Sequence, residues 1–246
     1  MPLLNEFSIQ LYSVRDAMEK DFIGVLEKLG KNGMGYTGVE FAGFGGLPVG
    51  ELKKVLDDNG LKPIASHTGP DRLLGALDEE IAYQKELGIE YIICPWADMK
   101  TKAGVIALAK DFTVVAEKIT AAGMKFGYHN HAHEFVVDEG EYLMDIFLDN
   151  MPSGTILELD IFWSEYAGVD SLAYMEKHKK IMELLHIKQI DKDKNNPEVD
   201  KGLIDFADVI AKAKIMGVKH FILEQEEYEV SSMASAEHAI KYIMNL

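Results

Sequence analysis

Gly123-Met124-Lys125-Phe126-Gly127-Tyr128-His129 is the segment whose pattern decides the fold. A glycine stands directly before an apolar residue, a short strand-like run follows, and the run ends in a polar side chain. Glycine after a helix supplies a left-handed cap, and the apolar residue then begins a buried strand. We expect the same cap at the other helix ends where a glycine precedes an apolar residue: Gly33-Met34, Gly60-Leu61, Gly88-Ile89 and Gly217-Val218.

Short apolar runs recur along the whole chain, and the segments between them show the three- and four-residue apolar spacing of helices. This alternation predicts an α/β protein built from βα units. The expected strands are Phe7–Tyr12, Gly38–Phe41, Leu61–Ser66, Tyr91–Pro95, Lys125–His129, Thr155–Asp160, Leu184–Lys188 and His220–Gln225. Eight such units close a (β/α)₈ TIM barrel, whose usual length is about 250 residues.

No linker or low-complexity tract divides the 246 residues, so we expect residues 1–246 to form a single barrel domain. The main alternative is a doubly wound open sheet, which normally has a glycine-rich phosphate turn after its first strand. Here that stretch reads Gln10-Leu11-Tyr12-Ser13-Val14-Arg15-Asp16, and the later cluster Gly43-Phe44-Gly45-Gly46 does not match GxGxxG. The barrel is therefore the favoured fold.

The composition excludes some classes of partner. A formal charge of −16 argues against nucleic acid and anionic membranes, which select for clustered Lys and Arg. The first residues lack a signal-peptide pattern and no apolar stretch is long enough to span a membrane, so we expect a cytoplasmic protein. The single cysteine, Cys94, lies in an apolar run and is interpreted as a buried thiol rather than a nucleophile. The oligomeric state is left open, with a homodimer as one option.

Tyr128-His129-Asn130-His131-Ala132-His133-Glu134-Phe135 is the stretch richest in chemistry, with three of the chain's eight histidines and a carboxylate. In an extended segment the three imidazoles project to one side. The alternative is a polar loop with solvated imidazoles. Neutral imidazole and carboxylate are common ligands for divalent ions, so we interpret the stretch as part of a metal or acid/base site.

The barrel requires functional residues at the C-terminal ends of its strands. Every expected strand ends in polar or aromatic side chains: Gln10 and Tyr12, Glu40, Ser66 and His67, Trp96, His129 to Glu134, Asp160 and Trp163, His186 and Lys188, and Glu224 and Glu226. Asp160 and Glu224 directly follow apolar runs, where an unpaired carboxylate is costly to desolvate. An ion pair with Lys188 is one way to offset this desolvation cost. A divalent ion of Mn, Mg, Co or Zn at the mouth serves all these groups at once.

The whole chain resembles the sugar phosphate isomerase/epimerase family with the xylose isomerase-like barrel. The resemblance lies in Gln10 to Asp16, Gly38 to Gly43, Tyr128 to His131 with Glu134-Phe135, Leu159-Asp160, His186 to Lys188 and Leu223-Glu224. In ketose epimerases of this family a Glu, an Asp, a His and a second Glu bind one divalent ion, and the two glutamates exchange protons with the substrate. Asp160, His186 and Glu224 match by position.

The fifth strand departs from the family, because His129 stands where the first Glu is expected. Either His129 is the ligand or the chain bends so that Glu134 is. We favour Glu134, which keeps three carboxylates, so the expected ligand set is Glu134, Asp160, His186 and Glu224. With this set, the two proton-exchanging glutamates that the resemblance implies are Glu134 and Glu224. His131 and Lys188 are further catalytic candidates, because they are mouth groups able to serve as acid, base or oxyanion partner. The expected substrate-binding residues are Gln10, Tyr12, Glu40, His67, Trp96 and His129.

The implied reaction is proton abstraction next to a carbonyl of a small-molecule carbohydrate, with a metal-stabilised enediolate. A sugar isomerase or epimerase is the first hypothesis. The loss of a glutamate on the fifth strand removes one of two opposed bases, so a metal-dependent lyase or dehydratase acting on a keto-sugar or inosose is the second. A non-catalytic sugar-binding barrel is the alternative from another class.

Overall fold

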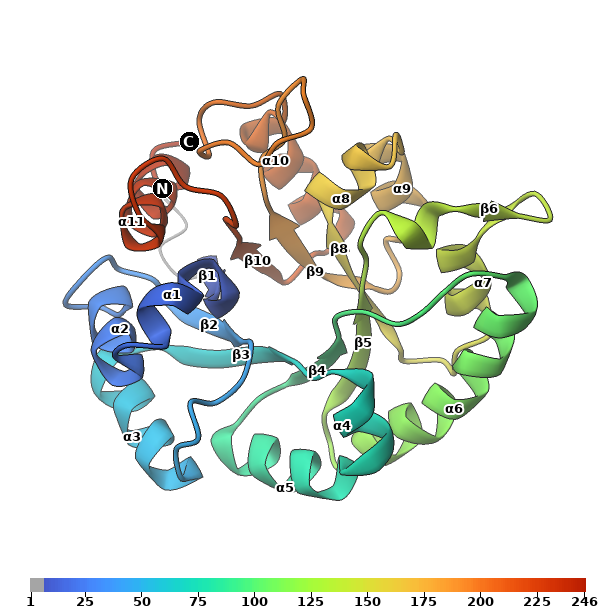
Figure 1. The fold of residues 1–246 in the computed structure, drawn as a ribbon, viewed down its shortest axis with the longest axis horizontal. Helices are drawn as coiled ribbons and strands as arrows, with labels where there is room; N and C mark the ends of the chain where they lie inside the picture. Colours follow the sequence, from blue (N-terminus) through green and yellow to red (C-terminus); the bar gives the residue numbers. More distant parts are fainter. Residues whose placement is uncertain (1–6) are drawn as a thin grey trace.

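The computed structural model describes residues 7–246 and contains a closed barrel of eight parallel strands (Figure 1). Around the barrel the strands follow the order β1-β10-β9-β8-β5-β4-β3-β2. They are β1 (Phe7–Gln10), β2 (Gly38–Phe41), β3 (Lys62–His67), β4 (Tyr91–Cys94), β5 (Lys125–His129), β8 (Ile156–Asp160), β9 (Met182–Ile187) and β10 (His220–Leu223). The predicted TIM barrel is confirmed.

Helices surround the strands on the outside of the barrel (Figure 1). They are α1 (Arg15–Met18), α2 (Phe22–Leu29), α3 (Val49–Asn59), α4 (Pro70–Gly75), α5 (Leu77–Leu87), α6 (Lys102–Ala121), α7 (Leu143–Asp149), α8 (Ile161–Tyr166), α9 (Ser171–His178), α10 (Phe206–Met216) and α11 (Ser232–Ile243). Short 3₁₀ turns η1 (Leu11–Val14) and η2 (His133–Phe135) follow β1 and β5, and β6 (Val137–Asp138) pairs with β7 (Glu141–Tyr142) as a hairpin. Within residues 7–246, no helix is long and apolar enough to cross a membrane.

The expected strands all form, and two of them, β2 and β5, have the expected bounds. The first strand ends at Gln10 rather than Tyr12, because the Gln10 side chain accepts a hydrogen bond from the Tyr12 backbone N–H and caps the turn η1. Gly60, Gly88 and Gly217 are the expected left-handed caps.

The expected cap at Gly33 is wrong, because α2 already ends at Leu29. The Gly33 backbone N–H instead donates to the Gly30 carbonyl, within a tight turn that leads toward β2. A Cβ atom at Gly33 would lie 1.9 Å from the Lys28 carbonyl oxygen. Glycine is therefore required at this position for a close backbone approach, not for a left-handed cap.

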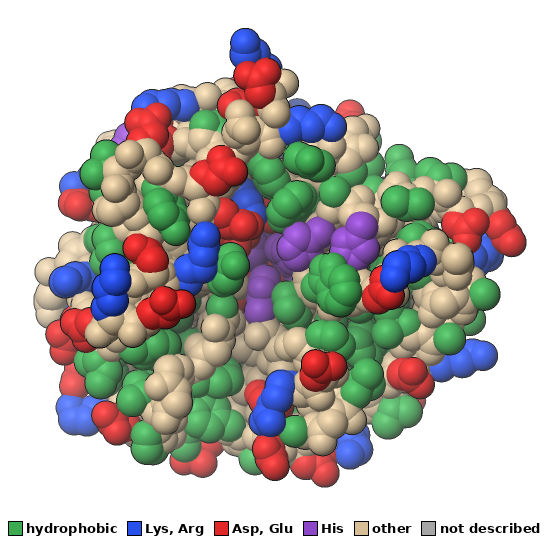
Figure 2. Space-filling view, in the orientation of Figure 1, with side chains coloured by type: hydrophobic (Ala, Val, Ile, Leu, Met, Phe, Trp, Pro, Cys, Tyr) green, Lys and Arg blue, Asp and Glu red, His purple; other side chains and the backbone are tan. Residues whose placement is uncertain are grey.

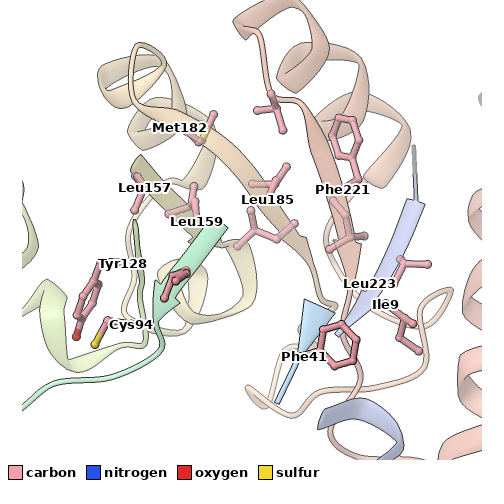
Figure 3. Close-up of a cluster of buried hydrophobic side chains, with 14 of the residues drawn as sticks. Ile9, Phe41, Cys94, Tyr128, Leu157, Leu159, Met182, Leu185, Phe221 and Leu223 are labelled. Carbon is pink, nitrogen blue, oxygen red and sulfur yellow. The ribbon is translucent and has the colours of Figure 1, made fainter. Parts of the chain in front are cut away.

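The core has two parts, which follow from the alternation of side chains along each strand. Outward residues such as Leu157, Leu159 and Leu185 pack against the helices (Figure 3). Inward residues fill the barrel with a smaller cluster made of Ile64, Ala65, Tyr91, Ile93, Ile156, Leu184 and Ile222. Cys94 is a buried free thiol, as expected, and burial raises its pKa to about 12. The polar groups of the mouth lie above the inner apolar cluster.

Asp145 ties α7 to α9 and gives a stability prediction. Its carboxylate accepts from the Tyr174 hydroxyl (3.0 Å) and Lys177 Nζ (2.6 Å) and lies 2.8 Å from His178 Nε2. Partial burial raises the pKa of Asp145, but the hydrogen bonds from His178 and Lys177 outweigh it and hold the pKa below its usual value. Since the folded pKa is depressed, the stabilisation is complete above the unfolded pKa of about 3.9 and is lost as the pH falls through the folded value.

We therefore expect Asp145→Asn to lower the free energy of unfolding by about 1–3 kcal/mol at pH 7, the usual worth of hydrogen bonds to a charged group. Urea unfolding at several pH values measures this difference. It should shrink as the pH falls below about 4 and be smallest below the folded pKa, where Asp145 is neutral in the folded protein as well. A difference that stays constant down to pH 2 would contradict the assignment of this carboxylate as an ionised partner.

Candidate active site at the barrel mouth

The inward face of β8 carries two carboxylates. Ile156 belongs to the inner apolar cluster, whereas Leu157 and Leu159 pack outward. The two-residue period therefore places Glu158 and Asp160 on the same inward face, one above the other. Both are fully buried. The other strands repeat this arrangement, so that apolar side chains at the bottom of the barrel are followed by a polar layer and then by the mouth.

Histidine and carboxylate groups from neighbouring strands converge in this polar layer. Figure 2 shows histidine side chains gathered in the hollow at the centre of the barrel face. Two overlapping sets have ligand-type atoms within 4.8 Å of one another: an outer group of His129, Asp160, His186 and Glu224, and an inner group of His67, His129, Glu158 and His186. Three of the four ligands expected from the sequence lie together in the outer group.

The outer group contains a buried carboxylate oxygen without a hydrogen-bond donor. Asp160 Oδ1 accepts from the Trp163 backbone N–H at 3.1 Å and caps α8, but Oδ2 has no hydrogen-bond partner among the described residues. Burial raises the pKa of Asp160 to about 6, with the nearby positive charge of Lys188 acting in the opposite direction. His186 Nδ1 lies 3.0 Å from Glu224 Oε2 and 4.0 Å from Asp160 Oδ2.

Lys188 is the cation of the mouth. Its ammonium group is buried, lies 3.4 Å from Glu224 and 3.7 Å from Asp160, and forms an ion pair with Glu226. Burial lowers the pKa of Lys188, but Glu224, Asp160 and Glu226 outweigh it, so the pKa is raised. Burial raises the pKa of Glu224, but the charge of Lys188 and the hydrogen bond and charge of His186 outweigh it and hold the pKa well below its usual value. One lysine thus faces three carboxylates.

The inner group surrounds one oxygen of Glu158. Oε2 of this residue lies 2.8 Å from His67 Nε2, 3.3 Å from His129 Nδ1 and 3.5 Å from His186 Nε2. Below it, Glu40 Oε2 accepts from Gln10 Nε2 at 2.8 Å and lies 2.7 Å from His186 Nε2. Burial, together with the charge of Glu158, raises the pKa of Glu40 to about 7.

Glu134, the fifth-strand ligand favoured from the sequence, does not lie in either group. Its carboxylate accepts from the Tyr128 hydroxyl (2.9 Å) and from the His131 backbone N–H (2.8 Å), and His133 Nδ1 lies 3.2 Å away. The 3₁₀ turn η2 directs the side chain back toward β5 and away from the mouth. In both groups the member from β5 is His129, the other alternative that the sequence left open.

His131 lies beside the outer group. Its ring is 5.1 Å from that of His129 and 5.1 Å from that of Trp163. Burial lowers the pKa of His131 to about 4, so that its imidazole is neutral at pH 7. Its Nδ1 is buried and has no hydrogen-bond partner among residues 7–246. A neutral imidazole beside the outer group has a lone pair that is able to accept a proton.

The expected substrate-binding residues fall into three sets, one of which is His67 with His129, both members of the inner group. Gln10 and Glu40 are fully buried and hydrogen-bonded to each other, so they support the mouth from below rather than line it. His67 is mostly buried and belongs to the inner group. Tyr12 and Trp96 are exposed, with 44% and 47% of their surfaces accessible, and are therefore free to meet a substrate at the rim.

Glu158 is the residue that sequence reasoning missed. Its signal was present, because Asp160 was expected to point inward and a strand places residue i−2 on the same face. The apolar neighbours in Leu157-Glu158-Leu159 made it look like an ordinary strand position. Glu226 was noted at its strand end but given no role, and its ion pair with Lys188 only appears once β9 and β10 lie side by side.

A family model described as the xylose isomerase-like TIM barrel matches residues 32–246. The match spans most of the sequence, so this chain belongs to the xylose isomerase-like TIM barrel family. No curated protein matches the sequence.

Solved structures share the fold over nearly the whole chain. A sugar phosphate isomerase/epimerase from Parabacteroides distasonis has a TM-score of 0.82 at 24% identity, covering 98% of this chain and 94% of that one. An L-ribulose 3-epimerase has a TM-score of 0.71 at 17% identity, covering 97% and 93%. The probable 3-DHS dehydratase AsbF from Bacillus anthracis has a TM-score of 0.74 at 12% identity, covering 98% and 99%. At these identities the similarity shows the fold.

Proposed function

We propose that this protein is a divalent-metal-dependent sugar isomerase or epimerase that removes a proton next to a carbonyl group. The observation that carries the proposal is the outer group, in which His129, Asp160, His186 and Glu224 converge from four adjacent strands at the barrel mouth. Membership of the xylose isomerase-like family supports it. The substrate we propose is a small carbohydrate rather than nucleic acid, in keeping with the charge of −16.

The chemistry of the donor set fits a divalent ion. Two imidazoles and two carboxylates would hold it, a mixture that suits Mn, Co or Zn and is acceptable to Mg. The orphaned Oδ2 of Asp160 supports this assignment, because a buried carboxylate oxygen without a donor is costly. The buried carboxylates of Asp160 and Glu224 share Lys188 with Glu226, and Glu224 also lies 3.0 Å from His186 Nδ1, so a divalent ion bound at His186 would supply positive charge to both carboxylates.

A bound divalent ion supplies Lewis-acid polarisation of a carbonyl oxygen. Side chains of the protein provide the base, the stabilisation of negative charge and the contacts with the sugar carbons. His131, whose imidazole is neutral at pH 7 and lies next to that of His129, is the proposed base. The Lys188 ammonium, held in place by its ion pairs, stabilises negative charge that develops on a substrate oxygen. Trp163, packed against His131, offers an apolar ring face to the carbons of a sugar.

A second hollow lies at the ends of β1 and β2, on the same face of the barrel as the outer group. A pocket of about 570 Å³ lies beside the ends of β1 and β2, and Tyr12, Arg15, Phe22 and Gly45 are among its lining residues. The Arg15 guanidinium stacks on the Tyr12 ring at 4.3 Å and donates to backbone carbonyl groups. We propose that this pocket binds a sugar or sugar-linked group, with the Tyr12 ring and hydroxyl and the Arg15 guanidinium as its contacts.

A metal-dependent lyase or dehydratase acting on a keto-sugar or inosose is the second candidate. The observation that favours it is the imidazole of His129 at the β5 position of the outer group, where a carboxylate base would be expected in an epimerase. With His131 as a single base, loss of a β-leaving group is simpler than return of the proton to the opposite face. The fold does not choose, because it is shared by an epimerase and a dehydratase.

Incubation with keto-sugars and inososes in deuterated water, with Mn²⁺ restored, tests the proposal by NMR. An isomerase or epimerase incorporates solvent deuterium at the carbon next to the carbonyl while the carbon skeleton keeps its oxygens. A lyase instead gives an unsaturated or deoxygenated product. A protein that binds a divalent ion and the sugars, yet shows neither exchange nor elimination, would be the non-catalytic sugar-binding barrel.

The β5 ligand gives a sharper prediction, because two nearby variants should behave differently. His129→Ala removes a member of the outer group and is expected to lower metal affinity at least tenfold. Glu134→Gln keeps an amide oxygen to accept from the His131 N–H, and its NH2 group can donate to the Tyr128 hydroxyl oxygen, so it is expected to leave the affinity within about twofold. Isothermal titration with Mn²⁺ measures both. A loss of affinity in Glu134→Gln alone would return the ligand assignment to Glu134.

A further inference from the structure

The two overlapping groups at the mouth share His129 and His186, and each of these imidazoles has one ring nitrogen facing an inner carboxylate. We propose that Glu40 and Glu158 are positioning residues that orient the two imidazoles, so that His186 presents Nδ1 and His129 presents Nε2 to the ion. This inference rests on the proposed function, and it adds which nitrogen binds and which buried groups decide it.

His186 gives the clearest geometry. Its two ring nitrogens face opposite layers of the site: Nε2 lies 2.7 Å from Glu40 Oε2, and Nδ1 lies 3.0 Å from Glu224 Oε2. A histidine that binds a metal through one nitrogen usually donates its other N–H to a carboxylate or carbonyl, which fixes both the tautomer and the ring orientation. Glu40 stands at that position. The ring is fully buried, so water does not compete for the Nε2 proton.

Glu40 is itself held in place. Its Oε2 accepts from Gln10 Nε2 at 2.8 Å, and Gln10 Oε1 accepts in turn from the Tyr12 backbone N–H at 3.0 Å. Gln10 and Glu40 lie opposite each other in the parallel register of β1 and β2. The orientation of His186 is therefore linked through side chains of β1 and β2 to the backbone of the turn η1, which gives it little freedom to rotate.

His129 is oriented from the other side. Its Nδ1 lies 3.3 Å from Glu158 Oε2 but has no hydrogen-bond partner among the described residues. We infer that a small rotation of the ring completes this hydrogen bond when an ion is bound, which leaves Nε2 for the outer group. Glu158 Oε2 also lies 2.8 Å from His67 Nε2, and the His67 ring stacks on that of His186 with an angle of 4° between the planes. Glu158 and His67 thus form a packed support behind both imidazoles.

The alternative use of the inner group is as a metal site of its own, formed by His67, His129, Glu158 and His186. We favour the orienting role because the inner group contains His186 Nε2, which Glu40 already approaches at hydrogen-bond distance. If an ion occupied the inner group, His186 Nδ1 would point to the outer carboxylates without a role in binding. The two uses predict different nitrogens on the ion and different effects of substitution.

Substitution of the inner carboxylates is expected to weaken binding without removing it. Glu40→Gln and Glu158→Gln should each lower Zn²⁺ affinity by about 10- to 100-fold while the stoichiometry stays at one, as is typical of groups that orient ligands. Glu183→Gln is the matched control. That glutamate lies at the start of β9, at the opposite end of the barrel, where it accepts from Tyr91, Lys125 and Lys219. Its substitution should leave the affinity unchanged.

Two-bond ¹H–¹⁵N spectra of the ¹⁵N-histidine-labelled wild type with bound Zn²⁺ test the nitrogen assignment without any variant of a carboxylate. Signals are assigned with His129→Gln and His186→Gln. The expected result is a proton on Nε2 of His186 and on Nδ1 of His129, with the other nitrogen of each ring bound to zinc. The reverse pattern on either ring would overturn the inference.

Titration of the variants completes the test. Loss of binding in Glu158→Gln together with retained binding in Glu224→Gln would place the ion in the inner group and overturn the inference, as would unchanged affinity in both Glu40→Gln and Glu158→Gln. Either result leaves the metal dependence of the protein standing. A wild type that binds no divalent ion overturns the proposed function and this inference with it.

Discussion

Asp160→Asn is expected to lower the affinity for divalent ions by more than about 100-fold, beyond the loss typical of groups that only orient a ligand, and to abolish turnover. The reason is that Asp160 Oδ2 is a buried carboxylate oxygen of the outer group with no hydrogen-bond donor. The fold should survive. Asn caps helices as well as Asp does, and the Oδ1 atom that accepts from the Trp163 N–H is retained.

Asp170→Asn is the matched control for this substitution. Asp170 caps α9 by accepting from the Ala173 backbone N–H at 3.0 Å, as Asp160 caps α8, but it belongs to neither metal group. We expect the Asp170→Asn variant to have the ion affinity and activity of the wild type. Titration with Mn²⁺ and circular dichroism of both variants make the comparison. Equal affinity in Asp160→Asn and Asp170→Asn would remove Asp160 from the ligand set.

Lys188→Met is expected to have the opposite effect on the ion. Without the ammonium, the carboxylates of Asp160, Glu224 and Glu226 lose their buried cation, so the affinity for a divalent ion should rise while turnover is lost. The ion-free protein should lose about 3–5 kcal/mol of unfolding free energy, because a buried charge group is left uncompensated. Urea unfolding with EDTA and with Mn²⁺ measures this, and the ion should recover much of the loss.

Lys125→Met provides the comparison at the other end of the barrel. Lys125 pairs with Glu183 at 2.6 Å but is about one-third exposed. Its removal should cost at most about 1 kcal/mol, as is usual for accessible ion pairs, and should not change ion affinity. If Lys188→Met is as mild as Lys125→Met and binds the ion no more tightly, Lys188 does not balance the charge of the mouth.

Much of the fold could be predicted from local sequence, because both of its signals are local. The apolar runs of β2 and β5 have the bounds that the sequence indicates, and Gly60, Gly88 and Gly217 mark helix ends by their left-handed backbone conformation. The prediction of a left-handed cap at Gly33 was wrong, although the sequence signal there is the same as at the other three glycines. A glycine required by close approach to a neighbouring carbonyl looks identical in sequence to one required by a left-handed cap.

The site was less predictable, because its members are set by turns and by pairing between strands. The proximity of Asp160, His186 and Glu224 could be predicted because each follows a strand, and the C-terminal ends of barrel strands meet at one face. The place of Glu134 depends on η2, a single 3₁₀ turn that returns its carboxylate to the His131 N–H. The spacing between His129 and Glu134 in the sequence does not predict that turn. Glu158 required only the strand period, but its role depends on His67 from another strand.

The central claim is that one divalent ion is held by His129, Asp160, His186 and Glu224. Anomalous diffraction from crystals grown with Mn²⁺, collected on both sides of the manganese absorption edge, tests it most directly. The expected result is a single manganese peak bordered by these four side chains, with Glu134 still hydrogen-bonded to Tyr128. No peak at the mouth, or a peak ligated by Glu134, would contradict the account.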